Sequence, residues 1–185
     1  MKKTKTIIAA VVLLLVFVVG GAIAYFTDTD DNDIPDVAEN MLPGQSVTKD
    51  PVINNVSTKN AAYVFAKVEV PCTTIVAPAT SSEELFTYTV NAGWTELTVA
   101  NELPVACTSG GTATHVYYYG SNGTLTSLAK ETSTTNPVFS TVTLRSTLKG
   151  NEGLTGEKQI VITGYGIQTE GLTSVTPANV WANFD

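Results

Sequence analysis

The chain has little of what enzyme centres and nucleic-acid interfaces are usually built from. Its 185 residues include one histidine, two cysteines, and 10 Lys or Arg residues against 17 Asp or Glu residues. A zinc peptidase needs three protein ligands, normally with two histidines one helical turn apart, whereas His115 stands alone in a β-type run. A nucleic-acid partner requires a basic surface that can neutralise phosphate. We therefore expect no enzyme activity and no nucleic-acid partner.

The longest apolar stretch lies at the N-terminus. Three lysines within residues 2–5 precede the apolar run Ile7–Val19, and Ala22 and Ala24 form a small-x-small cleavage site before Tyr25. This pattern predicts a secretory signal peptide over the first 24 residues. The alternative is an uncleaved membrane anchor, but the apolar run is shorter than the ~20 residues that a spanning helix needs. We expect a secreted protein of the extracellular matrix or cell surface, which meets the membrane only as a precursor.

The next segment, residues 25–41, is an acidic arm. Without the first 24 residues the chain keeps seven basic against 17 acidic residues, a net charge of −10. Six of the acidic side chains fall within residues 28–39, where they repel one another unless a cation or solvent screens them. Their spacing matches the ligand positions of an EF-hand calcium loop, but Asp33 stands where that loop needs glycine. Calcium is therefore the one candidate cofactor, and a solvated arm is the alternative. The candidate ligands are Asp28, Asp30, Asn32, the main-chain carbonyl of Ile34, Asp36 and Glu39.

The two cysteines, Cys72 and Cys107, predict a disulfide, because an even pair in an exported chain is normally oxidised. Two buried free thiols are the alternative. No Cys-x-x-Cys or His-x-x-x-His spacing accompanies the pair, so a metal site is not expected there.

From Met41 onward the residues predict an all-β domain, which we place over residues 42–185. The run Ala62–Val70 alternates Val and Ala with larger or charged residues such as Phe65, the period of a half-buried strand. Turn pairs such as Asn122-Gly123 separate similar runs. Seven or eight short strands of this kind predict an antiparallel jelly-roll-like β-sandwich. Thr176 and Pro177 predict a short C-terminal helix through Phe184. The other strands are expected at residues 46–57, 85–90, 96–99, 114–119, 138–148 and 158–168.

Short motifs spread over nearly the whole chain resemble those of a known family. They are Ala24-Tyr25-Phe26-Thr27-Asp28, Leu42-Pro43-Gly44, Lys49-Asp50-Pro51-Val52 followed by Asn54 and Val56, Ala62-Tyr63-Val64, Gly93-Trp94, and Ile162-Thr163-Gly164-Tyr165 followed by Ile167 and Gln168. In this order they are similar to the TasA and camelysin family, exported proteins of Gram-positive bacteria that a SipW-type signal peptidase processes. The Asp-rich arm, the cysteine pair and a length shorter than that of TasA depart from the family and suggest a minor or accessory subunit.

The resemblance implies a structural subunit of biofilm-matrix fibres that polymerises by donor-strand complementation. In this mechanism the N-terminal segment of one mature subunit adds a strand to the next. The implied partners are further copies of this chain or related fibre subunits, together with the signal peptidase that acts on the precursor. The candidate apolar anchors of the donor strand are Tyr25, Phe26, Ile34 and Val37.

The sequence leaves two alternatives to a fibre subunit. Aromatic side chains at Trp94, Trp181 and residues 117–119 would suit a monomeric surface or carbohydrate-binding module if they were exposed. A camelysin-like metallopeptidase is the second alternative, and the presence of a single histidine, His115, argues against it.

Overall fold

The computed structural model describes residues 41–73, 83–108, 110–131, 133–148 and 158–184. The predicted signal peptide lies outside these ranges, and so does the acidic arm up to residue 40. Within the described ranges, no helix has the length and apolar character that crossing a bilayer requires.

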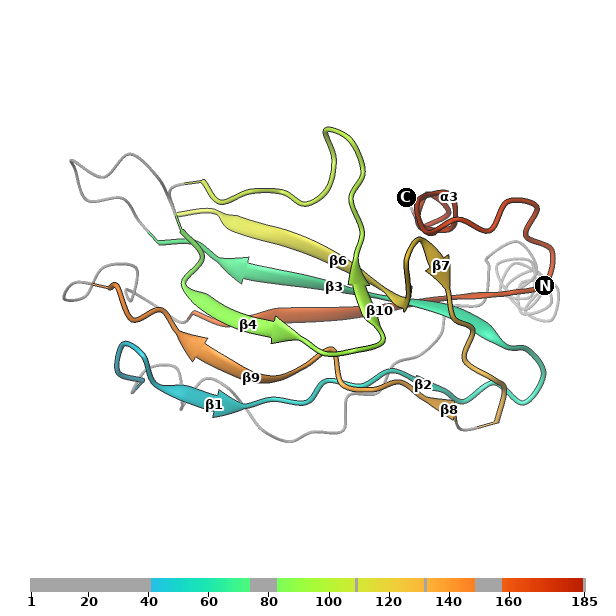
Figure 1. The fold of residues 1–185 in the computed structure, drawn as a ribbon, viewed down its shortest axis with the longest axis horizontal. Helices are drawn as coiled ribbons and strands as arrows, with labels where there is room; N and C mark the ends of the chain where they lie inside the picture. Colours follow the sequence, from blue (N-terminus) through green and yellow to red (C-terminus); the bar gives the residue numbers. More distant parts are fainter. Residues whose placement is uncertain (1–40, 74–82, 109, 132, 149–157, 185) are drawn as a thin grey trace, which may run out of the picture.

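Among the described residues, two larger antiparallel sheets, one two-stranded sheet and one short helix make up the domain, which confirms the prediction of an all-β sandwich. The smaller sheet has the strand order β1-β9-β4, and the larger has the order β10-β3-β6-β5, with β7 paired to the end of β6 (Figure 1). A separate two-stranded sheet pairs β2 with β8. The jelly-roll form of the sandwich stays a prediction. The strands are β1 (Ser46–Thr48), β2 (Asn54–Asn55), β3 (Ala62–Pro71), β4 (Phe86–Val90), β5 (Trp94–Glu96), β6 (Thr112–Ser121), β7 (Thr124–Leu125), β8 (Ser133–Thr134), β9 (Phe139–Leu144) and β10 (Val161–Gln168).

The main core lies between the two sheets. Strand β3 contributes Val64, Ala66 and Val68, each at most 1% exposed, and the smaller sheet contributes Phe139 and Leu144, both 0% exposed. These β3 residues share one face because successive side chains of a strand point to opposite sides. The predicted alternation of Ala62–Val70 is therefore confirmed for the face that meets the other sheet.

On the opposite face of β3, Phe65 is buried as well, so the prediction of a half-buried strand is wrong at this residue. This side chain is 0% exposed because the C-terminal helix α3 (Pro177–Trp181) and the residues after it cover it. The ring of Phe65 lies 5.5 Å from that of Trp181 and 5.7 Å from that of Phe184, between ring centroids. Such aromatic contacts contribute beyond the area that they bury. The C-terminal segment thus forms a second, smaller core outside the larger sheet.

The turn after β6 and the N-terminal cap of α3 form at the residues from which the sequence predicts them. Asn122 and Gly123 have φ values of 51° and 74°, as a two-residue hairpin between β6 and β7 requires. The Thr176 hydroxyl accepts a hydrogen bond from the Asn179 N–H at 3.3 Å and caps α3. The helix ends at Trp181, three residues earlier than predicted.

Several predicted strands have different bounds in the structure: the strand expected over residues 138–148 covers only β9, the one expected over 158–168 covers only β10, and β6 is longer than the expected 114–119. Two further differences have a clear cause. The expected strand over residues 46–57 is split into β1 and β2, with Pro51 between them, a residue that has no N–H to donate to a sheet. The expected strand over residues 96–99 begins earlier, as β5 at Trp94. It stops short of Val99 because this residue turns back to bond with Leu103, its N–H lying 3.0 Å from the Leu103 carbonyl.

Candidate functional site

Most of the predicted site residues lie outside the described residues, and their roles stay predictions. They are the cleavage residues Ala22, Ala24 and Tyr25, the donor-strand candidates Tyr25, Phe26, Ile34 and Val37, and the calcium candidates Asp28, Asp30, Asn32, Ile34, Asp36 and Glu39. In the part of the chain that the structure describes, no three His, Cys, Asp or Glu side chains converge as a metal site requires.

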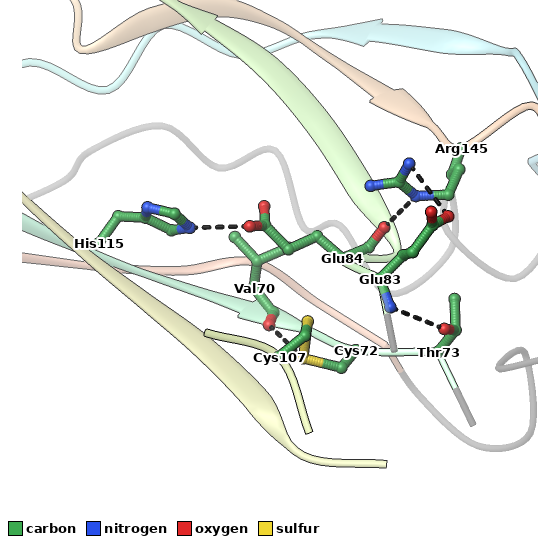
Figure 2. Close-up of a disulfide and its surroundings, with 8 residues drawn as sticks. All are labelled: Val70, Cys72, Thr73, Glu83, Glu84, Cys107, His115 and Arg145. Atoms are coloured by element: carbon green, nitrogen blue, oxygen red, sulfur yellow. Dashed lines mark hydrogen bonds and ion pairs between the residues drawn. A yellow bond between two sulfur atoms is a disulfide. The ribbon is translucent and has the colours of Figure 1, made fainter. Parts of the chain in front are cut away.

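The disulfide between Cys72 and Cys107 is present, which confirms the predicted pairing (Figure 2). Their Cα atoms lie 5.7 Å apart, within the usual span of a disulfide. Cys72 follows β3 directly, and its N–H donates to the carbonyl of Gly111 at 2.9 Å. The bond therefore ties the end of β3 to the segment that leads into β6.

Close to the disulfide, His115 on β6 is held between two carboxylates. Its Nε2 atom lies 2.9 Å from an Oε1 of Glu84, and its Nδ1 atom lies 2.6 Å from an Oε1 of Glu96. Glu96 belongs to β5 in the same sheet, whereas Glu84 belongs to the segment that enters β4 in the other sheet. The cluster therefore links the two sheets at this end of the sandwich.

A second ion pair anchors the same segment. The Arg145 guanidinium lies 3.3 Å from Glu83 and donates from Nε to the main-chain carbonyl of Glu84 (Figure 2). The Glu83 N–H in turn donates to the Thr73 hydroxyl at 3.2 Å. These contacts hold the segment of Glu84 in place, so that its carboxylate lies beside Nε2 of His115.

The two carboxylates keep His115 charged. The hydrogen bond to Glu84 is the main cause that raises the pKa of His115 to about 9; burial opposes the rise and the bond to Glu96 adds to it. At neutral pH both ring nitrogens therefore carry a proton, and both donate. An imidazolium of this kind has no lone pair to accept a proton or bind a metal. The sequence predicts that His115 is a strand residue, and it lies on β6. The sequence did not predict that His115 also links the two sheets through Glu84 and Glu96.

Two tyrosines continue this polar cluster between the sheets. The hydroxyls of Tyr88 on β4 and Tyr117 on β6 lie 3.0 Å apart, and the Tyr117 ring stacks on His115 with centroids 6.2 Å apart. Burial raises the pKa of Tyr117 to about 12 and raises that of Tyr88 further, so both hydroxyls stay neutral. Sequence reasoning missed Glu84 and Glu96 as partners of His115. Their one signal was that each is a carboxylate within or next to a predicted strand.

The aromatic residues expected to be available for ligand stacking are mostly packed inside. Trp94 is 6% exposed, Tyr117 5% and Tyr118 4%, and the Trp94 indole donates to the main-chain carbonyl of Asn136 at 2.8 Å. Trp181 is partly buried and packs on Phe65. The rings of Trp94, Tyr117 and Tyr118 are therefore not available for a sugar to stack on.

Strand β10 forms the most extensive open edge among the described residues. It pairs with β3 over eight residues, from Val161 opposite Glu69 to Gln168 opposite Ala62, without a register shift, and it pairs with no other described strand. It contains no proline, Lys, Arg, Asp or Glu. Edge strands are usually protected by such residues, by bulges or by shortness. β10 has none of these protections.

The other sheet edges differ. Edge strands β1 and β5 have three residues each, too short to template a long partner. The remaining edge strand of these two sheets, β4, has five residues and pairs only with β9. β10 thus offers the longest row of unpaired backbone groups within the described part of the chain.

Comparison with known proteins adds no further identification, because no family model, no curated protein and no solved structure matches this chain.

Proposed function

We propose that this chain is a secreted structural subunit of extracellular fibres, in which the acidic arm of one copy adds a strand to the β10 edge of the next. The observation that supports the proposal most is β10 itself, an edge of eight residues without charge, proline or bulge. Natural proteins seldom leave such an edge open unless another strand occupies it. The resemblance to the TasA and camelysin family implies the same mode of assembly.

The arm has the length that this role needs. An eight-residue strand extends about 27 Å at the usual rise per residue, and residues 25–40 provide twice that number of residues. A donor strand gains backbone hydrogen bonds along the edge, and its alternate side chains give specificity. Removal of the first 24 residues would turn the arm into a free terminus, so export would permit assembly.

The folded domain starts just after the arm. Met41 is 5% exposed and belongs to the main core, and the Gly44 N–H donates to the Leu144 carbonyl at 2.8 Å. A chain that begins at Met41 should therefore keep the sandwich and lose only the donor. We expect it to stay monomeric, and a synthetic peptide of residues 25–40 should bind to it.

A substitution on the edge tests the acceptor side. Val161 lies on β10 and is 41% exposed, and Val175 lies off the edge and is 43% exposed. Lysine on an edge strand opposes the addition of another strand, so Val161→Lys should suppress polymers in electron micrographs and Val175→Lys should not. Normal polymers from Val161→Lys, or from the chain that begins at Met41, would contradict the proposal.

A further inference from the structure

The outer face of the smaller sheet carries a depression of about 310 Å³ that is lined by hydroxyl groups. Strand β4 contributes Thr87 and Thr89, and strand β9 contributes Ser140, Thr141 and Thr143. Asn91, directly after β4, completes the polar part of the lining. None of the lining residues is charged.

A bulge in β9 exposes two of these hydroxyls side by side. Tyr88 pairs with Val142, and Val90 pairs with Phe139. Between these two pairs β4 has one residue, whereas β9 has two, Ser140 and Thr141. As a result Ser140 and Thr141 are both exposed, although they are neighbours in a strand. A bulge of this kind bends its strand and redirects side chains, which accounts for a hollow on an otherwise regular face.

Several polar groups in the depression are available to a ligand. Among the described residues, no hydrogen bond engages the hydroxyl of Thr89 or Thr141. The Asn91 side-chain nitrogen donates to the Ser140 hydroxyl at 2.8 Å and to the Pro137 carbonyl at 3.1 Å, which leaves its oxygen as an acceptor. Tyr88 also lines the depression, but its hydroxyl is bonded to Tyr117 between the sheets and is not available there. Each hydroxyl can donate and accept.

We infer that this depression binds a neutral polysaccharide. Sugar hydroxyls also donate and accept, so they match a lining of hydroxyl and amide groups. A charged ligand would find no opposite charge there, and the net charge of −7 repels acidic polymers. The volume lies at the lower end of the range for ligand sites, room for about one or two sugar rings. The site lies on β4 and β9, so it does not depend on strand addition at β10.

Affinity electrophoresis of the purified protein tests the inference. The gels contain dextran, laminarin or hydroxyethylcellulose as neutral probes, and polygalacturonate as the acidic probe. Thr89→Val and Thr141→Val remove one hydroxyl each and keep the β-branched shape that suits a strand. Thr126→Val is the matched control, because Thr126 is also exposed and does not line the depression.

We expect retardation in at least one neutral gel and none in polygalacturonate. Each lining variant should weaken binding about fivefold, the value of one net hydrogen bond, while the control binds like the original chain. Thr141→Arg, which fills the hollow from an exposed position, should abolish binding and serves as a second variant if a valine variant folds poorly. The absence of retardation in every neutral gel, equal binding by the Thr89→Val Thr141→Val double variant, or preference for polygalacturonate would overturn the inference.

Discussion

The His115 cluster makes the stability of the domain depend on pH in a predictable direction. The pKa of His115 is raised from 6.5 to about 9 in the folded chain, chiefly by its hydrogen bond to Glu84. A group whose folded pKa is raised stabilises the fold fully below its unfolded pKa, and this contribution is lost as the pH rises through the folded value. We therefore expect the contribution of His115 to be complete below pH 6.5 and lost through pH 9.

The size of the effect follows from the shift. One pKa unit corresponds to about 1.4 kcal/mol, so the full shift would be worth about 3 kcal/mol. The Glu96 side chain is 41% exposed, so solvent weakens the contribution of its interaction with His115. We therefore expect the cluster to contribute about 2 kcal/mol to the unfolding free energy.

Urea unfolding of the original chain and of His115→Gln from about pH 6 to about pH 10 measures the effect. The difference in unfolding free energy should fall by about 2 kcal/mol over this range. Because the chain has one histidine, NMR can also follow its titration without overlap. Titration near 6.5, or a free-energy difference that does not change with pH, would refute the reasoning.

Three further predictions concern other parts of the chain. Replacing both cysteines by alanine opens a loop of 35 residues and should lower the unfolding free energy by about 3–4 kcal/mol, measured by urea titration under non-reducing conditions. Gly120→Ala should destabilise the domain more than Gly123→Ala in thermal unfolding, because a Cβ at Gly120 would lie 2.1 Å from the Thr124 carbonyl oxygen, whereas one at Gly123 meets nothing within 4 Å; equal melting points would contradict this. Calcium or low pH should promote polymerisation by neutralising the arm, since unpaired carboxylates are costly to bury; light scattering should show the calcium response weakened in Asp28→Asn with Asp30→Asn, and no response in the original chain would contradict it.

Much of the fold could be predicted because local chemistry decides it. The alternation in β3 placed Val64, Ala66 and Val68 on one face, and all three are in the core. The Asn122-Gly123 pair predicted its turn, and an even cysteine count predicted the disulfide. Each of these features depends on neighbours in the sequence or on a property of the whole chain.

The features that sequence reasoning missed depend on contacts between distant residues. Phe65 is buried by a helix that follows it by more than a hundred residues, so the period of its own strand could not reveal the cover. His115 finds Glu84 and Glu96 only after two sheets have formed. The open edge of β10 likewise follows from strand order, which the residues of β10 alone do not specify.

The measurement that tests strand addition most directly is hydrogen exchange of β10 in the monomer and in the polymer. In the monomer, the amides of residues 161–168 that do not bond to β3 should exchange readily, because no other described strand pairs with β10. In the polymer, an added strand would accept hydrogen bonds from these amides and slow their exchange. The account predicts protection of residues 161–168 on polymerisation. Polymers in which β10 exchanges as fast as in the monomer would contradict it.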